Sequence, residues 1–319
     1  MPLNNPLISI ITVNYNQADV TLELFRSIRE NSYQNIEVFL VDNASKENPE
    51  EKVKAKYPEV SVIVSDENLG FAGGNNLAIP HCNGDFIFFI NNDAELTNGC
   101  IEKLLEAFEE NKQLGIISPK ICYFPIEKNQ KKDILQFVGA TEISNFTARN
   151  KTIGAFEEDN GQFTTLTPTP YIHGAAMMAS RAVIEKVGMM SEVFFLYYEE
   201  LDWSERIRKA GYEIYVEPNA KIYHKESLTV GTDSPLKTYY INRNRILFMR
   251  RHKKSWQIVL FMFFLTFATI PKNTVRYLLA GRLDNLKAFY KALAWNLNNK
   301  LDDMDEAPTK KLSSVFNNI

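Results

Sequence analysis

Apolar segments alternate with amphipathic ones through the first 118 residues of the chain. Short segments rich in β-branched and aromatic residues are typical of buried strands. They stand at 7–13, 36–41, 60–64 and 85–90, with a shorter one at 115–118. Between them, apolar residues recur every three or four positions, which predicts helices at 19–29, 49–57, 71–79 and 101–108. This alternation predicts an α/β fold of βαβ units, with a mostly parallel sheet and helices on both faces.

The pattern is weaker in the second half of the chain. Polar residues dominate 123–170, where we expect insertion loops with at most one hairpin. A helix is predicted at 200–210 because Gly211 provides a typical stop signal. Two closing strands are then expected at 212–216 and 220–224.

Polar side chains follow three of the predicted strands at the point where each strand ends. They form the clusters Asn14-Tyr15-Asn16, Asp42-Asn43 and Asn91-Asn92-Asp93. In open α/β sheets, ligands bind beyond the carboxyl ends of the strands. The three clusters are therefore expected to converge on one site.

Asp93 and His224 are candidate metal ligands. A carboxylate at a strand end can hold a divalent cation whose remaining ligands are water and a diphosphate, which suits Mg²⁺ or Mn²⁺. An acidic turn before the helix at 101–108 is the alternative for Asp93, and the residues leave both open. His224 ends a predicted strand, where a structural histidine is commoner, but a neutral imidazole also suits such a metal.

Three acids, Glu199, Glu200 and Asp202, stand within four residues after an aromatic run. Acids favour the first turn of a helix, which explains one or two of them. A general base also requires a carboxylate in a pocket that tunes its pKa. We therefore interpret the three acids as candidate catalytic residues, with helix capping as the alternative.

The segment 67–76 is rich in glycine and asparagine. Glycines permit close approach of a ligand, and a helix start offers N–H groups to phosphate. The segment matches neither a dinucleotide fingerprint nor a Walker motif, so by itself it is a weak signal.

These four features occur in the order and spacing of one known family. From about residue 8 to residue 249, the chain resembles the family-2 inverting glycosyltransferases of the GT-A fold, most closely the rhamnosyltransferase-like branch. Asn91-Asn92-Asp93 stands where the family has its DXD metal motif, with Asn in place of the first Asp, so Asp93 alone carries the metal charge. Glu199 to Asp202 stands where the family has Glu-Asp-x-Asp, whose second acid is the usual base. The resemblance therefore favours Glu200, although its longer side chain leaves Glu199 open.

The resemblance also implies a nucleotide-sugar donor, dTDP- or UDP-linked, and an acceptor that is a glycan or a lipid-linked saccharide. His224 takes the place of a metal-ligating histidine, and Asp42 that of the residue that reads the base. The expected substrate-binding residues are Asn14, Asn16, Asp42, Asn43, Asn68, Gly70, Gly73, Asn75, Asn92, His173 and Gly174.

Three parts of the chain are expected on this basis. A GT-A catalytic domain covers 1–235, with a nucleotide-binding half at about 1–118 and an acceptor half at about 119–235. A helical C-terminal extension covers 236–300, and a polar tail covers 301–319.

Composition and charge limit the classes of molecule that the protein is expected to bind. Hydrophobic residues make up 45% of the chain and charged residues 24%, as in ordinary globular proteins, and a net charge of −3 gives no basic field for nucleic acid. Three cysteines without CxxC spacing predict neither a disulfide framework nor a zinc site. With no signal peptide pattern at the N-terminus, we expect a cytoplasmic protein.

A basic stretch from 243 to 254 precedes the uncharged apolar run 256–270, which we expect to end at Pro271 and Lys272. Basic residues beside an apolar helix suit anionic headgroups, and the run is short for a membrane span. Three roles stay open for this run: attachment to the inner face of the cell membrane, packing as a buried helix or homo-oligomer contact, and a true span.

The leading functional hypothesis is an inverting sugar transferase in cell-surface polysaccharide synthesis. A non-catalytic nucleotide-sugar or glycan-binding module on the same fold is the alternative.

Overall fold

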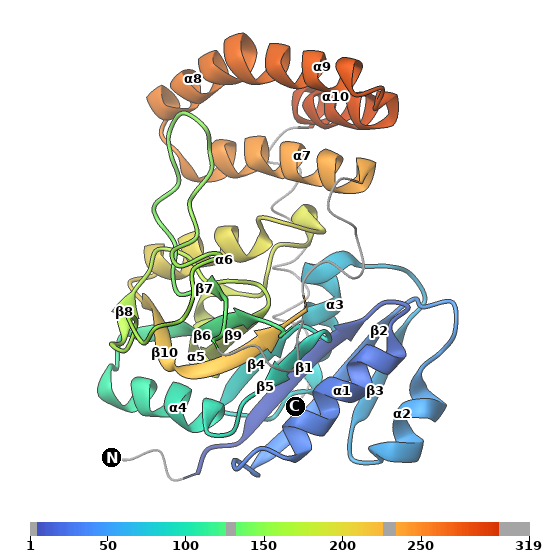
Figure 1. Cartoon of the computed structure of the whole chain (residues 1–319), viewed down its shortest axis with the longest axis vertical. Coiled ribbons are helices and arrows are strands. Elements are labelled where there is room, and N and C mark those ends of the chain that lie inside the picture. Colours follow the sequence, from blue (N-terminus) through green and yellow to red (C-terminus); the bar gives the residue numbers. More distant parts are fainter. Residues whose placement is uncertain (1–4, 126–131, 226–233, 300–319) are drawn as a thin grey trace.

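A ten-stranded sheet forms the centre of the molecule (Figure 1). The computed structural model describes residues 5–125, 132–225 and 234–299, so the expected polar tail lies outside the described residues. The main path of the sheet has the order β3-β2-β1-β4-β9-β6-β10-β5, and β7 and β8 pair with β6 and β10. The strands are β1 Ile8–Asn14, β2 Ile36–Asn43, β3 Ser61–Ser65, β4 Phe86–Ile90, β5 Ala94–Leu96, β6 Leu114–Tyr123, β7 Leu135–Phe137, β8 Thr167–Pro168, β9 Ala176–Ser180 and β10 Glu213–His224.

The sheet confirms the predicted α/β fold class and is mixed rather than purely parallel. Strands β1 to β4 pair in parallel, as do β6 and β10, but β9 is antiparallel to both β4 and β6. Parallel neighbours require a crossover connection, usually a helix. A long irregular insertion precedes β9 instead, and the strand enters the sheet in the opposite direction.

Helices cover both faces of the sheet, as predicted. On β4, Phe86, Phe88 and Ile90 pack into one core, while Ile87 and Phe89 pack into the other. Because both faces are buried, the strand is apolar throughout rather than alternating. The helices of this part are α1 Ala18–Arg29, α2 Glu50–Lys56, α3 Gly70–Ala78, α4 Cys100–Glu110, α5 Arg181–Val187 and α6 Glu199–Lys209, with 3₁₀ turns η1 Ile79–His81 and η2 Glu192–Phe194.

The two closing strands predicted at 212–216 and 220–224 are one strand, β10. It pairs with β6 along its length, with a register shift between Glu217 and Lys221. An irregularity of this kind bends a strand without ending its pairing. The bend brings His224, the last residue of β10, beside β5.

The helix α7, Pro235–His252, lies between the sheet domain and the remaining C-terminal helices (Figure 1). Most of the basic stretch falls on this helix and faces inward. Arg243 and Arg245 are buried, and Arg251 and Lys253 form ion pairs with acids of α6. The ion pairs of Arg251 and Lys253 hold the extension on the catalytic domain. Because all four side chains are buried or paired with acids, the expectation that the basic stretch meets headgroups is wrong for these four residues.

The apolar run belongs to one helix of 25 residues, Ser255–Leu279, which is long and apolar enough to cross a membrane by length and composition. It comprises α8 Ser255–Phe264, the π-helical turn η3 Leu265–Thr269 and α9 Ile270–Leu279. Pro271 was expected to end the run, but the helix continues through it. A proline ring crowds the carbonyl four residues earlier, and the wider π turn directly before it relieves that crowding. The last helix, α10 Leu283–Asn298, returns along α7.

Candidate active site

A cavity of about 400 Å³ opens at the carboxyl ends of β1, β2 and β4, where the sequence predicted a site. The strand ends contribute Asn43 and the segment 91–93, and the start of α3 closes one side. The loop before α6, the end of β10 and the start of α7 complete the wall. The lining residues are Val13, Tyr15, Asn43, Asn68, Gly70, Phe71, Asn91, Asn92, Asp93, Gln136, His173, Gly174, Ala175, Phe195, Leu196, Tyr197, Glu199, Glu200, His224, Leu236 and Lys237.

The two predicted metal ligands meet in this cavity. Asp93 Oδ1 lies 3.1 Å from His224 Nε2, and both residues are buried. They are adjacent because β5 directly follows Asp93 and pairs antiparallel with the end of β10. Residues 131 positions apart in the chain thus share one wall of the site.

The surroundings of His224 suit a neutral metal-ligating imidazole. Its Nδ1 lies 2.8 Å from Gln136 Oε1, which can only accept, so Nδ1 carries the proton. Nε2 is then a lone-pair atom that accepts from Asn91 Nδ2 at 3.2 Å and faces the Asp93 carboxylate. Two lone-pair atoms this close repel each other unless a cation lies between them. The donor set of one carboxylate and one oriented imidazole therefore fits a divalent metal ion.

Glu199 and Glu200, the candidate catalytic acids, both line the cavity. Glu199 is buried, Glu200 is half-buried, and the Oε2 atom of each has no hydrogen-bond partner among the described residues. Burial raises the pKa of Glu200 to about 7. Burial and the neighbouring Glu200 carboxylate raise the pKa of Glu199 well above its usual range. A carboxylate with a pKa near neutrality is suited to general-base catalysis, which favours Glu200 of the two.

The backbone before these acids is strained. Phe195, Tyr197 and Tyr198 have φ angles of 62°, 69° and 76°, a region that residues other than glycine rarely adopt. At Phe195 the strain is a tight γ-turn, in which the N–H of Leu196 donates to the carbonyl of Phe194 at 2.7 Å. Each such residue costs on the order of 1–3 kcal/mol and persists only where its surroundings hold it. Strain of this kind clusters at functional sites.

The structure does not bring Asp202 to the cavity. Its side chain is fully buried on the other side of α6, where it lies 2.7 Å from His252 Nε2 and 2.9 Å from Arg206 Nε. The hydrogen bond from His252 and the charges of Arg206 and Arg251 lower its pKa against the opposing effect of burial. Asp202 thus joins α6 to α7, which is a structural role.

Asn14 and Asp42 lie beneath the cavity wall rather than on it. Asn14 Nδ2 donates to Asp42 Oδ1 at 2.8 Å, and Ser45 closes the same network by donating from Oγ to that oxygen at 2.6 Å. Asn16 continues it on the surface, where its Oδ1 accepts from the N–H of Lys46. These residues fix the loops after β1 and β2. The contact of Asp42 with a base stays a prediction.

The predicted glycine-rich segment forms the start of α3, and Asn43 holds it in place. Asn43 Nδ2 donates to Asn68 Oδ1 and to the carbonyl of Gly70, at 3.1 and 3.0 Å. Gly70 has a φ of 71°, and a Cβ there would lie 2.2 Å from the carbonyl oxygen of Phe195. Only glycine allows this approach, which lets the N–H of Phe71 donate to the same oxygen at 2.7 Å. The start of α3 and the loop 194–198, which precedes Glu199, are thereby joined.

The other expected residues have different places. Gly73 and Asn75 lie inside α3 and do not line the cavity, while Asn92 lines it and donates to Thr21 Oγ1 at 3.1 Å. His173 and Gly174 lie on the wall, as predicted. Burial and the nearby His224 lower the pKa of His173 to about 3, so it stays neutral.

Sequence reasoning missed several wall residues. Gln136 lies on the short strand β7, in the insertion where no pattern marked a site. Leu236 and Lys237 begin α7, which was assigned to the extension rather than to the cavity. The aromatic run before Glu199 was the one available signal for Phe195 to Tyr197.

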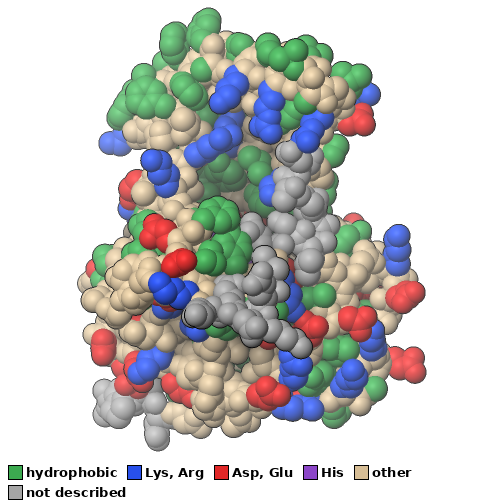
Figure 2. All heavy atoms as spheres, in the orientation of Figure 1, with side chains coloured by type: hydrophobic (Ala, Val, Ile, Leu, Met, Phe, Trp, Pro, Cys, Tyr) green, Lys and Arg blue, Asp and Glu red, His purple; other side chains and the backbone are tan. Residues whose placement is uncertain are grey.

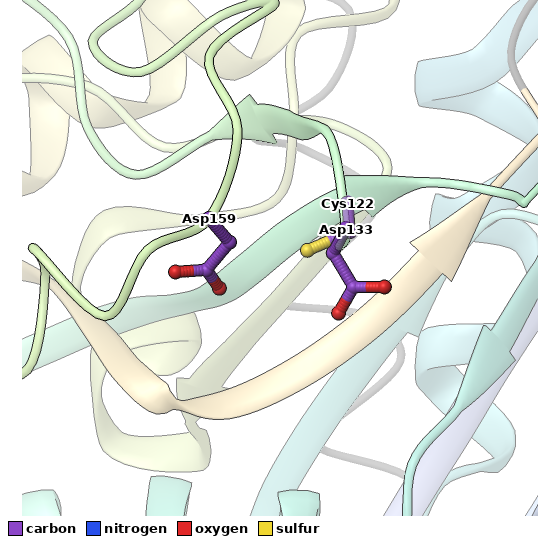
Figure 3. A group of neighbouring side chains, drawn as sticks. All are labelled: Cys122, Asp133 and Asp159. Carbon is purple, nitrogen blue, oxygen red and sulfur yellow. The ribbon is translucent and has the colours of Figure 1, made fainter. Parts of the chain in front are cut away.

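A second group of metal-binding side chains does not fit a metal. Cys122, Asp133 and Asp159 lie near one another beside β6 and β10 (Figure 3). Lys120 pairs with Asp159 at 2.6 Å and Lys221 with Asp133 at 2.9 Å, so both acids are already neutralised. Burial raises the pKa of the Cys122 thiol to about 12, which keeps it protonated. Asp133 and Asp159 therefore form two salt bridges, and Cys122 packs beside them.

The mixed sheet, with helices on both faces and a cavity at its strand ends, has the GT-A fold of solved glycosyltransferases. The model of the family "Glycosyl transferase family 2" matches residues 9–188, and the chain belongs to this family. Its relatives include the rhamnosyltransferases of the branch that the sequence resembles.

Three relatives align over most of their length. The low-salt glycan biosynthesis hexosyltransferase Agl10 of Haloferax volcanii is 27% identical over 75% of this chain and 74% of its own. The N-acetylglucosaminyl-diphospho-decaprenol L-rhamnosyltransferase of Mycobacterium tuberculosis is 21% identical over 78% of this chain and 86% of its own. The dTDP-rhamnosyl transferase RfbF of Shigella flexneri is 25% identical over 78% and 81%.

Solved structures share the fold. The mannosyltransferase PcManGT from Pyrobaculum calidifontis, in complex with GDP-Man and Mn²⁺, superposes with a TM-score of 0.56 at 16% identity, over 92% of this chain and 76% of its own. Residues 1–349 of S. aureus TarS, in complex with UDP-GlcNAc, give 0.58 at 15% identity, over 90% and 79%.

Proposed function

We propose that this glycosyltransferase moves a sugar from a dTDP- or UDP-linked donor to a hydroxyl of a glycan or lipid-linked acceptor, with inversion, in the synthesis of a cell-surface polysaccharide. The observation that carries the proposal is that one cavity holds both the Asp93–His224 pair and the unpaired acids Glu199 and Glu200. The donor and acceptor classes are supported by relatives whose names specify dTDP-rhamnosyl transfer and a decaprenol-linked saccharide.

Glu200 is the proposed base. Its carboxylate accepts the proton of the acceptor hydroxyl as the oxygen bonds to the anomeric carbon, and the bond from that carbon to the nucleoside diphosphate breaks. A single displacement of this kind inverts the configuration. A divalent ion, Mg²⁺ or Mn²⁺, held by Asp93 and His224 would supply Lewis-acid stabilisation of the departing diphosphate.

The first experiment is a thermal-shift screen of dTDP, UDP and GDP with and without Mn²⁺. A ligand that binds only the folded state raises its apparent stability, so dTDP or UDP should give a Mn²⁺-dependent shift. The sugar-linked form of the nucleotide that binds is then incubated alone and with acceptors, and the anomeric configuration is read by NMR. Mn²⁺-dependent binding without hydrolysis or transfer would instead mark the non-catalytic binding module.

We also propose that the protein is cytoplasmic and binds the inner face of the cell membrane through the outer face of the helix 255–279. Only 11% of its most apolar stretch is buried. Large exposed side chains recur on it every three or four residues, at Trp256, Val259, Phe263 and Phe267, while Phe261 and Leu265 face inward. Figure 2 shows hydrophobic side chains gathered along this edge of the molecule, with Lys and Arg side chains on the flank below. An apolar face beside a cationic flank suits a surface of anionic lipid.

The packing of α10 favours a helix lying on the membrane over one crossing it. Asn285, near the start of α10, donates to Thr238 of α7, and Asn296, near its end, donates to the carbonyl of Arg243. The turn at Gly281 joins α9 directly to α10. Both ends of the helix 255–279 are thus held on the same side of the molecule. A helix that crossed a membrane would instead place its two ends on opposite sides of the bilayer.

Liposome flotation tests this part of the proposal. We expect the protein to float with anionic vesicles at low salt and the variant Phe263→Glu to stay in solution. The control is Phe156→Glu, which places the same charge at an exposed phenylalanine of the sheet domain. The contrary outcome is a protein that does not bind anionic vesicles, elutes as a homo-oligomer, and is dissociated by Phe263→Glu. That result would make this face a subunit contact instead.

A further inference from the structure

Helix α7 packs along the segment 194–202, which contains the strained loop and the start of α6. Tyr240, Asn244, Phe248 and His252 are each four residues apart, so they share one face of the helix. Tyr240 stacks on Phe195 with ring centroids 4.8 Å apart. Further along, Phe248 packs against Tyr198 at 5.8 Å, and His252 contacts Asp202. One helix face therefore contacts the segment 195–202 at successive turns.

Asn244 makes the central contacts of this face. The side chain is fully buried, and its Nδ2 lies within hydrogen-bond distance of three carbonyl oxygens, those of Phe194, Leu196 and Tyr197, at 2.8, 2.8 and 2.7 Å. These carbonyls flank the γ-turn and the first left-handed residue after it. An amide that satisfies such carbonyls stabilises the strained conformation over relaxed alternatives.

Arg243 strengthens the same contact. Its guanidinium donates to the carbonyls of Val193 and Phe194, and it lies 4.7 Å from the ring centroids of both Tyr240 and Trp295. The arginine is thus fixed between aromatic rings while it binds the loop. Nothing in this arrangement touches the cavity directly, so its effect on chemistry must pass through the loop.

We propose that Asn244 is a positioning residue for the reaction: it holds the strained loop 194–198 in the one conformation that aims Glu199 and Glu200 into the cavity. Helix α7 then belongs to the catalytic domain functionally, although the sequence pattern assigned it to a C-terminal extension. The expected effect of Asn244 on kcat rests on the proposed function, whereas its effect on the conformation of the loop does not.

The test compares Asn244→Ala with Asn296→Ala. Asn296 is a matched control because it is a buried asparagine that binds α7 from α10, through the carbonyl of Arg243, without touching the loop. Asn244→Ala should lower kcat by about 10- to 100-fold, as misplacement of a catalytic group by about 1 Å does, with the donor KM within twofold of wild type. Asn296→Ala should keep the wild-type kcat.

Hydrogen–deuterium exchange provides a readout that does not depend on activity. Amides of 194–202 should exchange faster in Asn244→Ala and at the wild-type rate in Asn296→Ala. If Asn244→Ala does not fold, Tyr240→Leu removes the stack on the half-buried loop face and should change exchange and kcat in the same direction. Wild-type exchange and kcat in whichever of these two variants folds would overturn the proposal. If the loop amides exchange faster in Asn244→Ala but the wild-type protein transfers no sugar, the structural role of Asn244 stands and only the proposed function is refuted.

Discussion

Replacing Glu200 with Gln should inactivate the enzyme and stabilise it at high pH. Its pKa is raised from an ordinary 4.5 to about 7 in the folded protein. The folded state therefore binds more protons than the unfolded state between these pH values, and stability falls as pH rises through that window. At about 1.4 kcal/mol per pKa unit, the ionised carboxylate costs roughly 3 kcal/mol above pH 7. Glutamine has the same shape and no charge to bury.

The stability gain should be near zero at pH 4.5 and reach its full size by pH 8, a Tm increase on the order of 5 °C for a domain of this size. Turnover should fall by about 10²–10⁴-fold, the usual contribution of a general base, while Mn²⁺-dependent binding of the donor nucleotide stays. Differential scanning fluorimetry from pH 4.5 to 8.5, with a product assay at each pH, measures both effects. Glu199→Gln is the comparison within the pair.

Two outcomes would refute this reasoning. A Glu200→Gln protein with wild-type turnover, beside an inactive Glu199→Gln, would move the base to Glu199. A stability difference that does not depend on pH would show that Glu200 is not held against its ionisation in the folded state.

Three further predictions follow from single contacts. Asp93→Ala, or EDTA, should abolish turnover and Mn²⁺-dependent nucleotide binding by calorimetry; full activity in chelator would exclude the metal role. Gly70→Ala should lower Tm strongly and abolish activity because its Cβ would overlap the carbonyl of Phe195, whereas Gly99→Ala, with a similar φ but open space around it, should cost only about 1 kcal/mol. Asp202→Asn should destabilise the fold by about 3–5 kcal/mol in urea unfolding, because it leaves buried cations unpaired, and equal stability would contradict its structural role.

The nucleotide-binding half was largely predictable because its signals are local. Strands such as β4 are apolar on both faces, and the helices between them have regular amphipathic spacing, so element type and order followed from pattern alone. Position at a strand end then predicted that Asn43 and Asp93 face one cavity, since the carboxyl ends of parallel strands meet at one edge. Asn14 and Asp42 lie beneath the cavity wall, where they bind each other, and their part in substrate binding stays a prediction.

The antiparallel strand β9 could not be predicted in the same way. Its apolar residues look like those of a parallel strand, and direction depends on how the irregular insertion before it folds. Gln136 belongs to that insertion, where no periodicity marks a side chain that orients His224. The short strand β5 was missed because three residues are too few to show a period.

The basic stretch shows most clearly how sequence pattern and structure differ. A run of arginines and lysines before an apolar helix matches a membrane-surface signal, and the apolar helix itself keeps an exposed face. Arg243 nevertheless turns inward, where its guanidinium donates to the backbone carbonyls of Val193 and Phe194. Arg251 turns inward too and pairs with the buried carboxylate of Asp202.

The sequence by itself determined the α/β architecture, the family and about half of the residues that line the cavity, since local periodicity and motif spacing encode them. The tertiary structure alone decided which of the acids are unpaired. Glu199 and Glu200 lie in the cavity with unsatisfied oxygens. Asp202, two residues further along the same helix, is instead paired with Arg206 of α6 and with Arg251 and His252 of α7. The reason is geometric: neighbouring positions on a helix point to different sides, and the packing of a helix about 40 residues later adds counter-charges on the Asp202 side.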